Sequence, residues 1–344
     1  MAFTTINKSG VYFNTNIWSG NSSTQALTGV GFQPDWTWIK RRSGNGVYSH
    51  MAFDSVRGVT KSIVPDTTAA EGTQSNGLTA FGADGFTLGD ASAVNITGSN
   101  YVGWNWRAGN SAGSANSDGN TSTTVSVNTT AGFSVVKWTG TSGNTTIGHG
   151  LGATPAWVIM KNTGGSGTNW VVYSKSLKSG YFLKLNTTAA HSNSNVYFTS
   201  APTSSLLSLT GGTAANNNGN SMIAYCFAEK NGYSRFGYYM GNGNADGPFV
   251  YTGFAPAFVL QREVAVTRDW TLIDSVRSPH NERNDRLVPN ENALEVENNS
   301  IDLLSNGFKV RSNQTNSNDA GQSYIYMAFG QSIVGTNDVP CTAR

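Results

Sequence analysis

The residues best able to do chemistry in this 344-residue chain are few and scattered. Its four histidines are His50, His149, His191 and His280, and none has the spacing of a metal site with another histidine or with a cysteine. We therefore expect surface or turn histidines, with no bound metal and no cofactor. Residues 109–113 match the Gly-x-Ser-x-Gly pattern of a nucleophile elbow, but a Gly/Ser-rich stretch follows them where that motif requires a helix.

Two short charged motifs are better candidates for a specific role. The tetrapeptide Asp-Ser-Val-Arg occurs at 54–57 and again at 274–277, and its spacing suits a charge-assisted hydrogen bond that pins a turn. The corresponding stretch at 175–178 reads Lys-Ser-Leu-Lys and has no such pair. Glu71 and Glu295 also occupy matching places, where the middle copy has a histidine. Because no pair of carboxylates recurs, we predict a structural role and no catalytic residues.

Three aromatic residues beside Gly-rich turns are candidate binding residues. Trp18, Trp138 and Tyr239 each lie two residues before a glycine. A planar ring can stack on the face of a sugar, which makes these positions candidates for ligand contact. The alternative is that they fill hydrophobic cores, and the sequence leaves both interpretations open.

One stretch that occurs three times organises the chain, at residues 31–40, 152–161 and 253–262. Each copy runs from a glycine through a proline and an aromatic residue into alternating side chains, and ends at a basic residue. The residues that define it are Pro34, Pro155 and Pro256, followed by Trp36, Trp157 and Phe258. The prolines are about a hundred residues apart, which is domain-sized spacing.

This stretch predicts a strand that begins near its proline, since proline lacks an N–H and can open a strand but not lie inside a central one. Side chains then alternate between two faces, so Trp36 and Trp38 share one face. That face is large and apolar in all three copies, and we expect it to cover a core. The basic run at residues 40–42 is expected to be a strand end at solvent.

The rest of each copy predicts further strands. About seven or eight β-rich segments per copy, separated by turn residues, are typical of an antiparallel sandwich. No segment has a sustained helical period, and residues 291–304 are the best candidate for a short helix. We predict an all-β chain of three tandem homologous antiparallel β-sandwich domains, jelly-roll-like, with helix below about 10%.

The predicted domains are residues 1–109, 125–230 and 231–344, the last with a C-terminal tail. Residues 110–124 are rich in Gly, Ser and Asn and are expected to form a flexible linker.

The composition excludes several classes of function. Charged residues make up 12% of the chain and the net charge is +2, so there is no electrostatic footprint for nucleic acid. No apolar run of about 18 residues indicates a membrane span, and no signal peptide is evident at the N-terminus. Two cysteines are too few for a disulfide framework, and Cys226, within an apolar run, is expected to be a buried free thiol.

Three further motifs, at residues 148–155, 224–229 and 247–258, carry a resemblance to a known group. The chain resembles the repeat-bearing virion structural proteins of marine tailed phages, which are often described as tail-fibre-like. Residues 121–344 carry the resemblance best. It implies a particle component and supplies no catalytic residues.

From this resemblance we expect a non-enzymatic virion structural protein, tail-associated and fibre- or adhesin-like, that contributes to host-surface contact. An alternative is a capsid decoration or cement protein on the phage head, and a carbohydrate-processing enzyme is the third class. The expected partners are other virion proteins, host-surface glycan and further copies of the chain, with a trimer as the expected oligomer. The expected location is the virion, after synthesis in the host cytoplasm.

Overall fold

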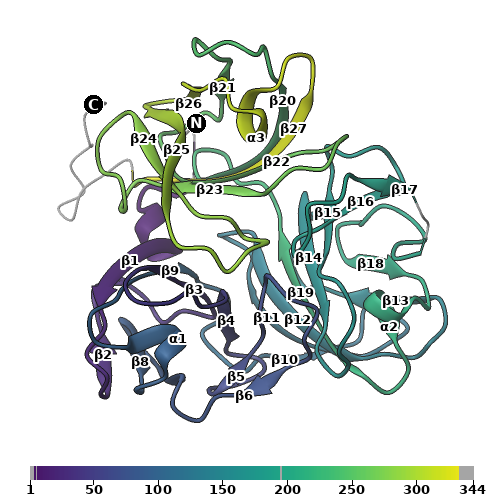
Figure 1. Cartoon of the computed structure of the whole chain (residues 1–344). Coiled ribbons are helices and arrows are strands. Elements are labelled where there is room, and N and C mark those ends of the chain that lie inside the picture. The colour runs from purple at the N-terminus through teal and green to yellow at the C-terminus, as the bar shows by residue number, and fades with distance from the viewer. Residues whose placement is uncertain (1–3, 5, 194–195, 333–344) are drawn as a thin grey trace.

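A computed structural model describes residues 4, 6–193 and 196–332 (Figure 1). Strands account for 44% of the chain and helix for 5%, and every pair of named strands is antiparallel. The all-β prediction, with helix as a minor component, is confirmed. Residues 333–344, which include the predicted C-terminal tail and Cys341, lie outside the described residues.

Each repeat builds a central sheet with one strand order. Repeats 1, 2 and 3 denote residues 1–109, 125–230 and 231–344. In each, the last strand is rich in aromatic residues and is here called the closing aromatic strand. It pairs on one side with the first strand and on the other with the strand that begins near the repeated proline, here called the Pro-aromatic strand. The sheets are β1 (Phe13–Ser19), β9 (Asn100–Trp106), β3 (Trp36–Ser43), β4 (Met51–Asp54); β12 (Phe133–Thr139), β19 (Ser221–Phe227), β14 (Trp157–Asn162), β15 (Val171–Ser174); and β20 (Ser234–Met240), β27 (Ser323–Gly330), β22 (Pro256–Glu263), β23 (Thr271–Asp274).

A smaller sheet covers the outer face of each central sheet. These sheets are β2 (Gln25–Leu27), β8 (Gly85–Leu88), β7 (Leu78–Gly82); β13 (Thr145–Gly148), β18 (Leu206–Leu209); and β21 (Phe249–Tyr251), β26 (Gly307–Val310), β25 (Val296–Leu304), β24 (Arg283–Arg286). The helix expected within residues 291–304 is wrong, because most of that segment is β25, which pairs with β26 across the Asn306-Gly307 turn.

The helices are single turns that precede the closing strands. They are α1 (Ser92–Asn95), α2 (Thr213–Asn216) and α3 (Thr315–Asn318), with a 3₁₀ turn, η1 (Ser9–Val11), near the N-terminus. In the described part of the chain, no helix has the length and apolar character needed to cross a membrane.

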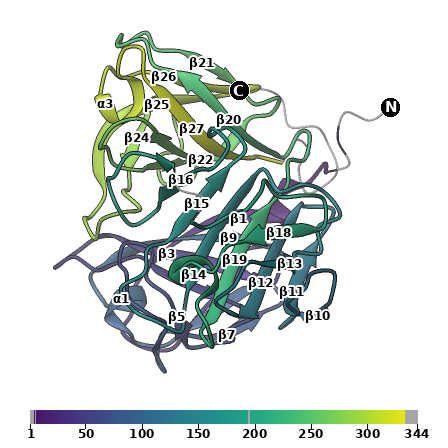
Figure 2. The same cartoon turned by 90° about the vertical axis from the view of Figure 1, so that its right-hand side faces the viewer.

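The three central sheets meet at one shared core (Figures 1 and 2). Trp36 of repeat 1 stacks on Tyr225 of repeat 2, with ring centroids 4.3 Å apart. Phe227 of repeat 2 contacts Phe329 of repeat 3 at 5.8 Å, and the ring of Phe258 lies 5.7 Å from that of Trp106. The expectation that the aromatic face of the repeated strand covers a core is confirmed, and that core is common to all three repeats.

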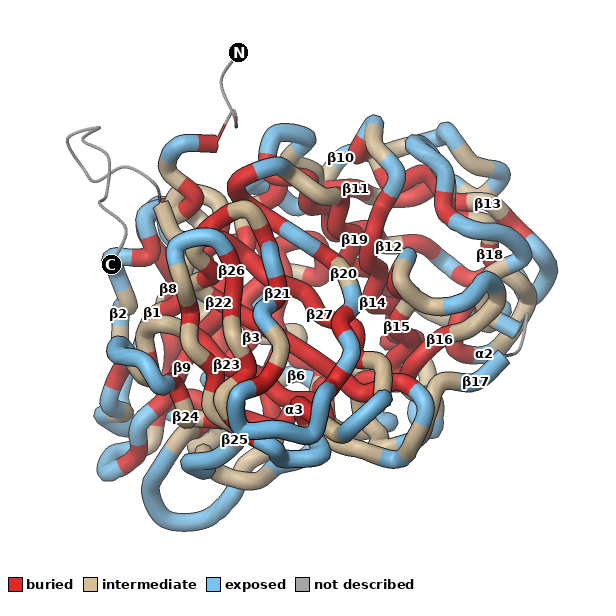
Figure 3. Tube along the Cα trace, turned by 90° about the horizontal axis from the view of Figure 1, so that it is seen from above, coloured by how far each residue is buried: buried red, intermediate tan, exposed pale blue. Residues whose placement is uncertain are grey.

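The opposite face of each central sheet is buried as well. Ile39, Val158 and Val259 belong to separate clusters beneath the outer sheets of repeats 1, 2 and 3. Figure 3 shows the buried residues running along the strands, with exposed residues at the peripheral loops. Each repeat is therefore a two-layer unit with its own outer core. Its inner apolar face would be exposed to water without the other two repeats.

Residues 110–124, expected as a flexible linker, are instead held by defined contacts. Strand β10 (Ser114–Asn116) pairs with β11 (Thr123–Asn128), and both extend the central sheet of repeat 2. Upstream, the buried carboxylate of Asp35 accepts hydrogen bonds from the backbone N–H groups of Ala108 and Asn110, at 2.7 and 3.0 Å, and one from the Ser126 hydroxyl. A linker rich in small polar residues is ordered here because its N–H groups find a buried acceptor and a strand partner.

Further short strands complete the sheets. Strands β16 (Tyr181–Lys184) and β17 (Ser192–Asn193) extend the sheet of repeat 2, and β5 (Lys61–Ser62) pairs with β6 (Gly72–Thr73) in repeat 1. The backbone N–H of Gly10 donates to the Ser332 hydroxyl at 3.0 Å, so the two ends of the described chain meet.

The shared core predicts how the protein unfolds. Trp157→Ala should lower the free energy of unfolding by about 3–5 kcal/mol, because its fully buried ring fills the space between repeats 2 and 3. Loss of this ring should weaken all three repeats together, giving one cooperative transition in calorimetry. Tyr238→Ala, at a side chain that is 65% exposed, is the control and should change stability by less than about 0.5 kcal/mol. Two separated transitions in the wild-type protein would contradict a common core.

Candidate functional site

The first charged motif is a buried junction between repeats 1 and 2. Asp54 and Arg57 are buried, and the Arg57 Nε donates to the Asp54 Oδ2 at 2.5 Å. The hydroxyl of Tyr225, on the closing strand of repeat 2, donates to the same carboxylate oxygen at 2.7 Å. Arg57 also donates to the backbone oxygens of Ala52 and Lys61, so its guanidinium ties the turn that contains it to β4 and β5.

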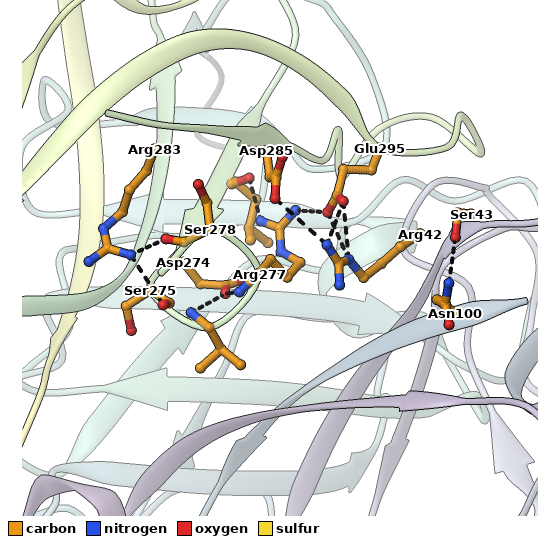
Figure 4. Close-up of polar contacts among 12 residues, drawn as sticks. Arg42, Ser43, Asn100, Asp274, Ser275, Arg277, Ser278, Arg283, Asp285 and Glu295 are labelled. Carbon is orange, nitrogen blue, oxygen red and sulfur yellow. Dashed lines mark hydrogen bonds and ion pairs between the residues drawn. The ribbon is translucent and has the colours of Figure 1, made fainter. Parts of the chain in front are cut away.

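The second motif repeats this geometry between repeats 3 and 1. The Arg277 Nε lies 2.5 Å from the Asp274 Oδ2, and the indole N–H of Trp104, on the closing strand of repeat 1, donates to that oxygen at 2.9 Å. Burial opposes ionisation of Asp274, but the Arg277 guanidinium and these hydrogen bonds outweigh it and hold the pKa of Asp274 below its usual value. Figure 4 shows Arg277 also meeting Glu295, which in turn binds Arg42 of repeat 1.

The third equivalent position has lost both polar partners. Strand pairing aligns Ser174 of repeat 2 with Asp54 and Asp274, so the matching tetrapeptide is 174–177, and the match expected at 175–178 is wrong by one residue. The closing-strand residue that matches Trp104 and Tyr225 is Met327 of repeat 3. The carboxylate and the closing-strand donor are missing together. This correlation fits a packing device between neighbouring repeats and gives no support to catalysis.

A second set of contacts closes the three repeats into a ring. The turns at residues 66–71, 186–191 and 290–295, here called the junction turns, each lie against the end of the Pro-aromatic strand of another repeat. The basic residue of that strand donates from its side chain to a carbonyl oxygen of the turn. The pairs are Lys40 with Asn292 at 2.9 Å, Lys161 with Thr68 at 3.2 Å, and Arg262 with Thr188 at 2.7 Å.

Aromatic and backbone groups reinforce the same ring. The indole N–H groups of Trp170 and Trp270 donate to the carbonyl oxygens of Val64 and Lys184, each in the preceding repeat, at 3.0 and 2.9 Å. In repeat 1 the matching residue is His50, whose Nε2 lies 3.0 Å from the Val288 oxygen. The last residues of the junction turns, Glu71, His191 and Glu295, donate backbone N–H groups to the oxygens of Thr163, Val264 and Arg42.

These contacts correct the expectation that residues 40–42 form a solvent-exposed strand end. The side chains of Lys40 and Arg41 are buried, and only Arg42 is partly exposed. Burial lowers the pKa of Lys40 to about 8, partly opposed by Asp66, and burial alone lowers the pKa of Lys161 to about 8. The two lysines are tolerated inside because each ammonium group donates hydrogen bonds to carbonyl oxygens of two repeats.

The three aromatic candidates for ligand contact are inside the outer cores. Trp18, Trp138 and Tyr239 are buried and belong to the clusters of repeats 1, 2 and 3. Their polar atoms are satisfied internally: the indole N–H of Trp18 donates to the Val94 oxygen, that of Trp138 to the Asn216 Oδ1, and the Tyr239 hydroxyl to the Ser317 oxygen. None offers a ring face to a sugar, so the core-filling alternative describes them.

A set of buried asparagines, not predicted from the sequence, holds the loops after the first strands. Asn95, Asn216 and Asn318 end the three short helices and are fully buried. Each side chain reaches across its repeat to a loop more than 70 residues away, and their acceptors include the carbonyl oxygens of Ser23, Gly143 and Asn244. A signal was available, because each asparagine stands six residues before the aromatic or apolar second residue of a closing strand.

The remaining reactive groups are structural in their surroundings. Of the histidines expected at the surface or in turns, His50 and His149 are instead fully buried. The Nδ1 of His50 accepts a hydrogen bond from the Trp38 indole at 2.9 Å, and burial holds its pKa well below the usual value. Cys226 is a buried free thiol, as expected, and burial raises its pKa to about 12. Within the residues that the structure covers, no group of three or more His, Cys, Asp or Glu side chains is placed to hold a metal ion.

A pocket of about 260 Å³ opens at the periphery of repeat 2, which contains β15 to β18 (Figure 1). We call it the repeat-2 pocket. Its walls are the β15–β16 connection and the segment before β18. It is lined by Tyr173, Lys175, Leu177, Lys178, Ser179, Gly180, Tyr181, Phe182, Tyr197, Phe198, Thr199, Ser200 and Ala201.

The aromatic residues of this pocket differ from those of the cores. Tyr173, Tyr181, Tyr197 and Phe198 are only half-buried. The ring of Tyr173 lies 5.4 Å from that of Phe198, and Tyr197 meets the buried Phe182 edge-to-face at 4.4 Å. Partial burial raises the pKa of Tyr173 and Tyr197, so both hydroxyls remain protonated donors at neutral pH.

The pocket arises where repeat 2 departs from its neighbours. Its Leu177 stands where repeats 1 and 3 have the inward-facing Arg57 and Arg277, and its half-buried Tyr173 stands where they have the fully buried Phe53 and Ile273. Loss of the Asp–Arg turn and gain of an open aromatic pocket therefore coincide in one repeat. This arrangement leaves aromatic rings at an open site, and none of the lining residues that the structure describes is an acid.

The Asp–Arg turns can be tested with a matched pair of variants. Arg277→Met should lower the free energy of unfolding by about 3–5 kcal/mol, because it leaves the buried Asp274 without its cation. Leu177→Met changes the same position of repeat 2, where no ion pair exists, and should cost less than about 1.5 kcal/mol. Both are measured by urea denaturation at neutral pH. Equal losses would show that the position matters only for packing.

The buried lysines predict a pH dependence. Their folded pKa of about 8 lies below the ordinary lysine value of 10.5, so the unfolded chain binds more protons between these values. Lys40 and Lys161 should therefore make the free energy of unfolding rise with pH across this window. In the Lys40→Met/Lys161→Met double variant that rise should be smaller, and in Lys137→Met, outside the junctions, it should be unchanged. Urea denaturation from pH 7.5 to 10 measures the slopes, and equal slopes in all three proteins would refute this assignment.

The comparisons with known proteins concern the whole three-repeat body. No curated protein matches the chain. No solved structure matches it. A family described as a domain of unknown function, DUF7483, matches residues 8–332, from the 3₁₀ turn before β1 to the residue that meets Gly10. Because the match spans all three repeats and the ring they close, the chain belongs to this family.

Proposed function

We propose that the protein is a non-enzymatic structural component of a tailed-phage virion, associated with the tail and contributing to host-surface contact through the repeat-2 pocket. The observation that carries the binding role is that this pocket occurs in one repeat of an otherwise repeated scaffold. The junction-turn contacts recur in all three repeats, whereas the half-buried tyrosines of the pocket do not. A constant scaffold with one divergent surface site is how binding function is commonly distributed.

The virion role draws on the sequence resemblance given above. In this proposal the repeats are homologous jelly-roll-like β-sandwich units fused around one core, and the chain associates with itself as a trimer and with other virion proteins. A fused body suits a particle component, because it fixes the direction of the pocket relative to the rest of the molecule. A carbohydrate-processing enzyme is less well supported, since no pair of acids lines the pocket.

A second candidate function, capsid decoration, is favoured by a different surface. Tyr238 and Met240 on β20, and Phe249 and Tyr251 on β21, are 47–65% exposed. Both strands lie at the edges of their sheets in repeat 3. Exposed large apolar side chains on edge strands suit contact with another protein better than contact with a sugar.

Two variants separate the candidates. Purified protein is incubated with host cells and, separately, with particles that lack it. Under the host-contact proposal, the Tyr181→Ala/Tyr197→Ala double variant should lose most cell binding, while Tyr238→Ala retains it. Under the decoration alternative, Tyr238→Ala should lose binding to bare particles, while the pocket variant retains it. Wild-type protein that bound particles and never cells would overturn host contact, and release of reducing sugar from host envelope would overturn both.

A further inference from the structure

We propose that the repeat-2 pocket binds a single anionic sugar residue, a pyranose that bears a carboxylate or sulfate group. This inference rests on the proposed host-contact function and names the ligand class of the same site. It is carried by three observations: the ring faces that line the pocket, its tyrosine hydroxyls, and the charge of its rim.

The ring faces supply an apolar platform. Tyr173, Tyr197 and Phe198 are half-buried, so part of each ring faces the pocket and part rests on the outer core of repeat 2. An aromatic face carries partial negative charge and attracts the weakly positive C–H groups on one side of a pyranose. A volume of about 260 Å³ is below the roughly 300–1,000 Å³ of pockets for drug-sized molecules, so it suits one ring with its substituents.

The tyrosine hydroxyls are available to a ligand. Three core tyrosines use their hydroxyls internally: Tyr101 donates to the Ser92 oxygen, Tyr225 to Asp54 and Tyr324 to the Thr315 oxygen. By contrast, within the described residues the hydroxyls of Tyr173, Tyr181 and Tyr197 make no hydrogen bond. Three half-buried donors and acceptors around an apolar platform match a ligand that carries several hydroxyl groups.

The rim of the pocket is positive. Its thirteen described lining residues include Lys175 and Lys178 and no acid. Lys175 is already engaged by Glu229, which also lies 3.5 Å from Arg235. Among the described residues Lys178 has no ion pair, and its side chain is exposed. In a chain with only 12% charged residues, an unpaired lysine at the mouth of an aromatic pocket favours an anionic substituent over a neutral sugar.

The test uses the full chain with two oligosaccharide probes of equal length, a hexuronic-acid trisaccharide and its neutral hexose counterpart, and a sulfated trisaccharide as a third. Isothermal titration should show the acidic probes binding about threefold tighter or more, as expected for one exposed ion pair. Lys178→Gln should remove that preference, whereas Lys137→Gln on β12, outside the pocket, should preserve it. Tyr181→Phe deletes only a hydroxyl and should weaken all three probes by about fivefold.

The outcomes distinguish failure of the anionic-sugar inference from failure of the proposed host-contact function. Equal affinity for acidic and neutral probes would overturn the anionic class while leaving glycan contact intact. A Glu-rich peptide that competed better than the acidic sugars would also overturn it, in favour of a protein ligand. If no probe binds while the wild-type chain still binds cells through the pocket tyrosines, the ligand class fails and the proposed function survives. If cells are not bound either, both fail.

Discussion

Burial of one aromatic face from each of three sheets in a common volume is the constraint on which the rest of the structure depends. Each central sheet has two apolar faces, and the outer sheet of its own repeat covers only one of them. The inner faces, with Trp36, Trp157 and Phe258, exclude water only when all three repeats are present. The junction turns and Asp–Arg pairs follow from this demand, because they provide hydrogen-bond partners for several of the polar groups that are carried inside when the sheets close together.

Much of the fold could be predicted from the sequence because each repeat shows the same alternation of side chains along its strands. Proline marks where the strand begins, and alternation after Trp36 marks a buried face. Each copy also ends on an aromatic-rich strand, which is β9, β19 or β27. The expected helix at 291–304 was wrong for a physical reason: β25 has little apolar alternation of its own and is fixed as a strand by pairing with β26 and β24.

The contacts between residues of different repeats could not be predicted from the sequence. Lys40 looked like a residue at a solvent-exposed strand end, because its carbonyl partner lies 252 residues away in repeat 3. Trp18 and Trp138 were candidates for ligand contact because they stand beside glycines. The helices whose residues accept their indole N–H groups come 76 and 78 residues later in the sequence. The repeat-2 pocket could be predicted only in part, because the sequence showed that repeat 2 lacks the Asp–Arg motif. Nothing in the sequence placed Tyr173 beside Phe198.

Each junction turn contacts the next repeat in a fixed cyclic order. The turn of repeat 1 lies on repeat 2, that of repeat 2 on repeat 3, and that of repeat 3 on repeat 1, and Gly10 and Ser332 meet where the ring is covalently open. The same contacts would form if the chain were opened between repeats 2 and 3 and joined near residues 10 and 332. The order 1-2-3 is therefore one of three circular permutations of a single closed assembly. The boundary between repeats is a feature of the polypeptide's connectivity and carries no weakness in the packed molecule.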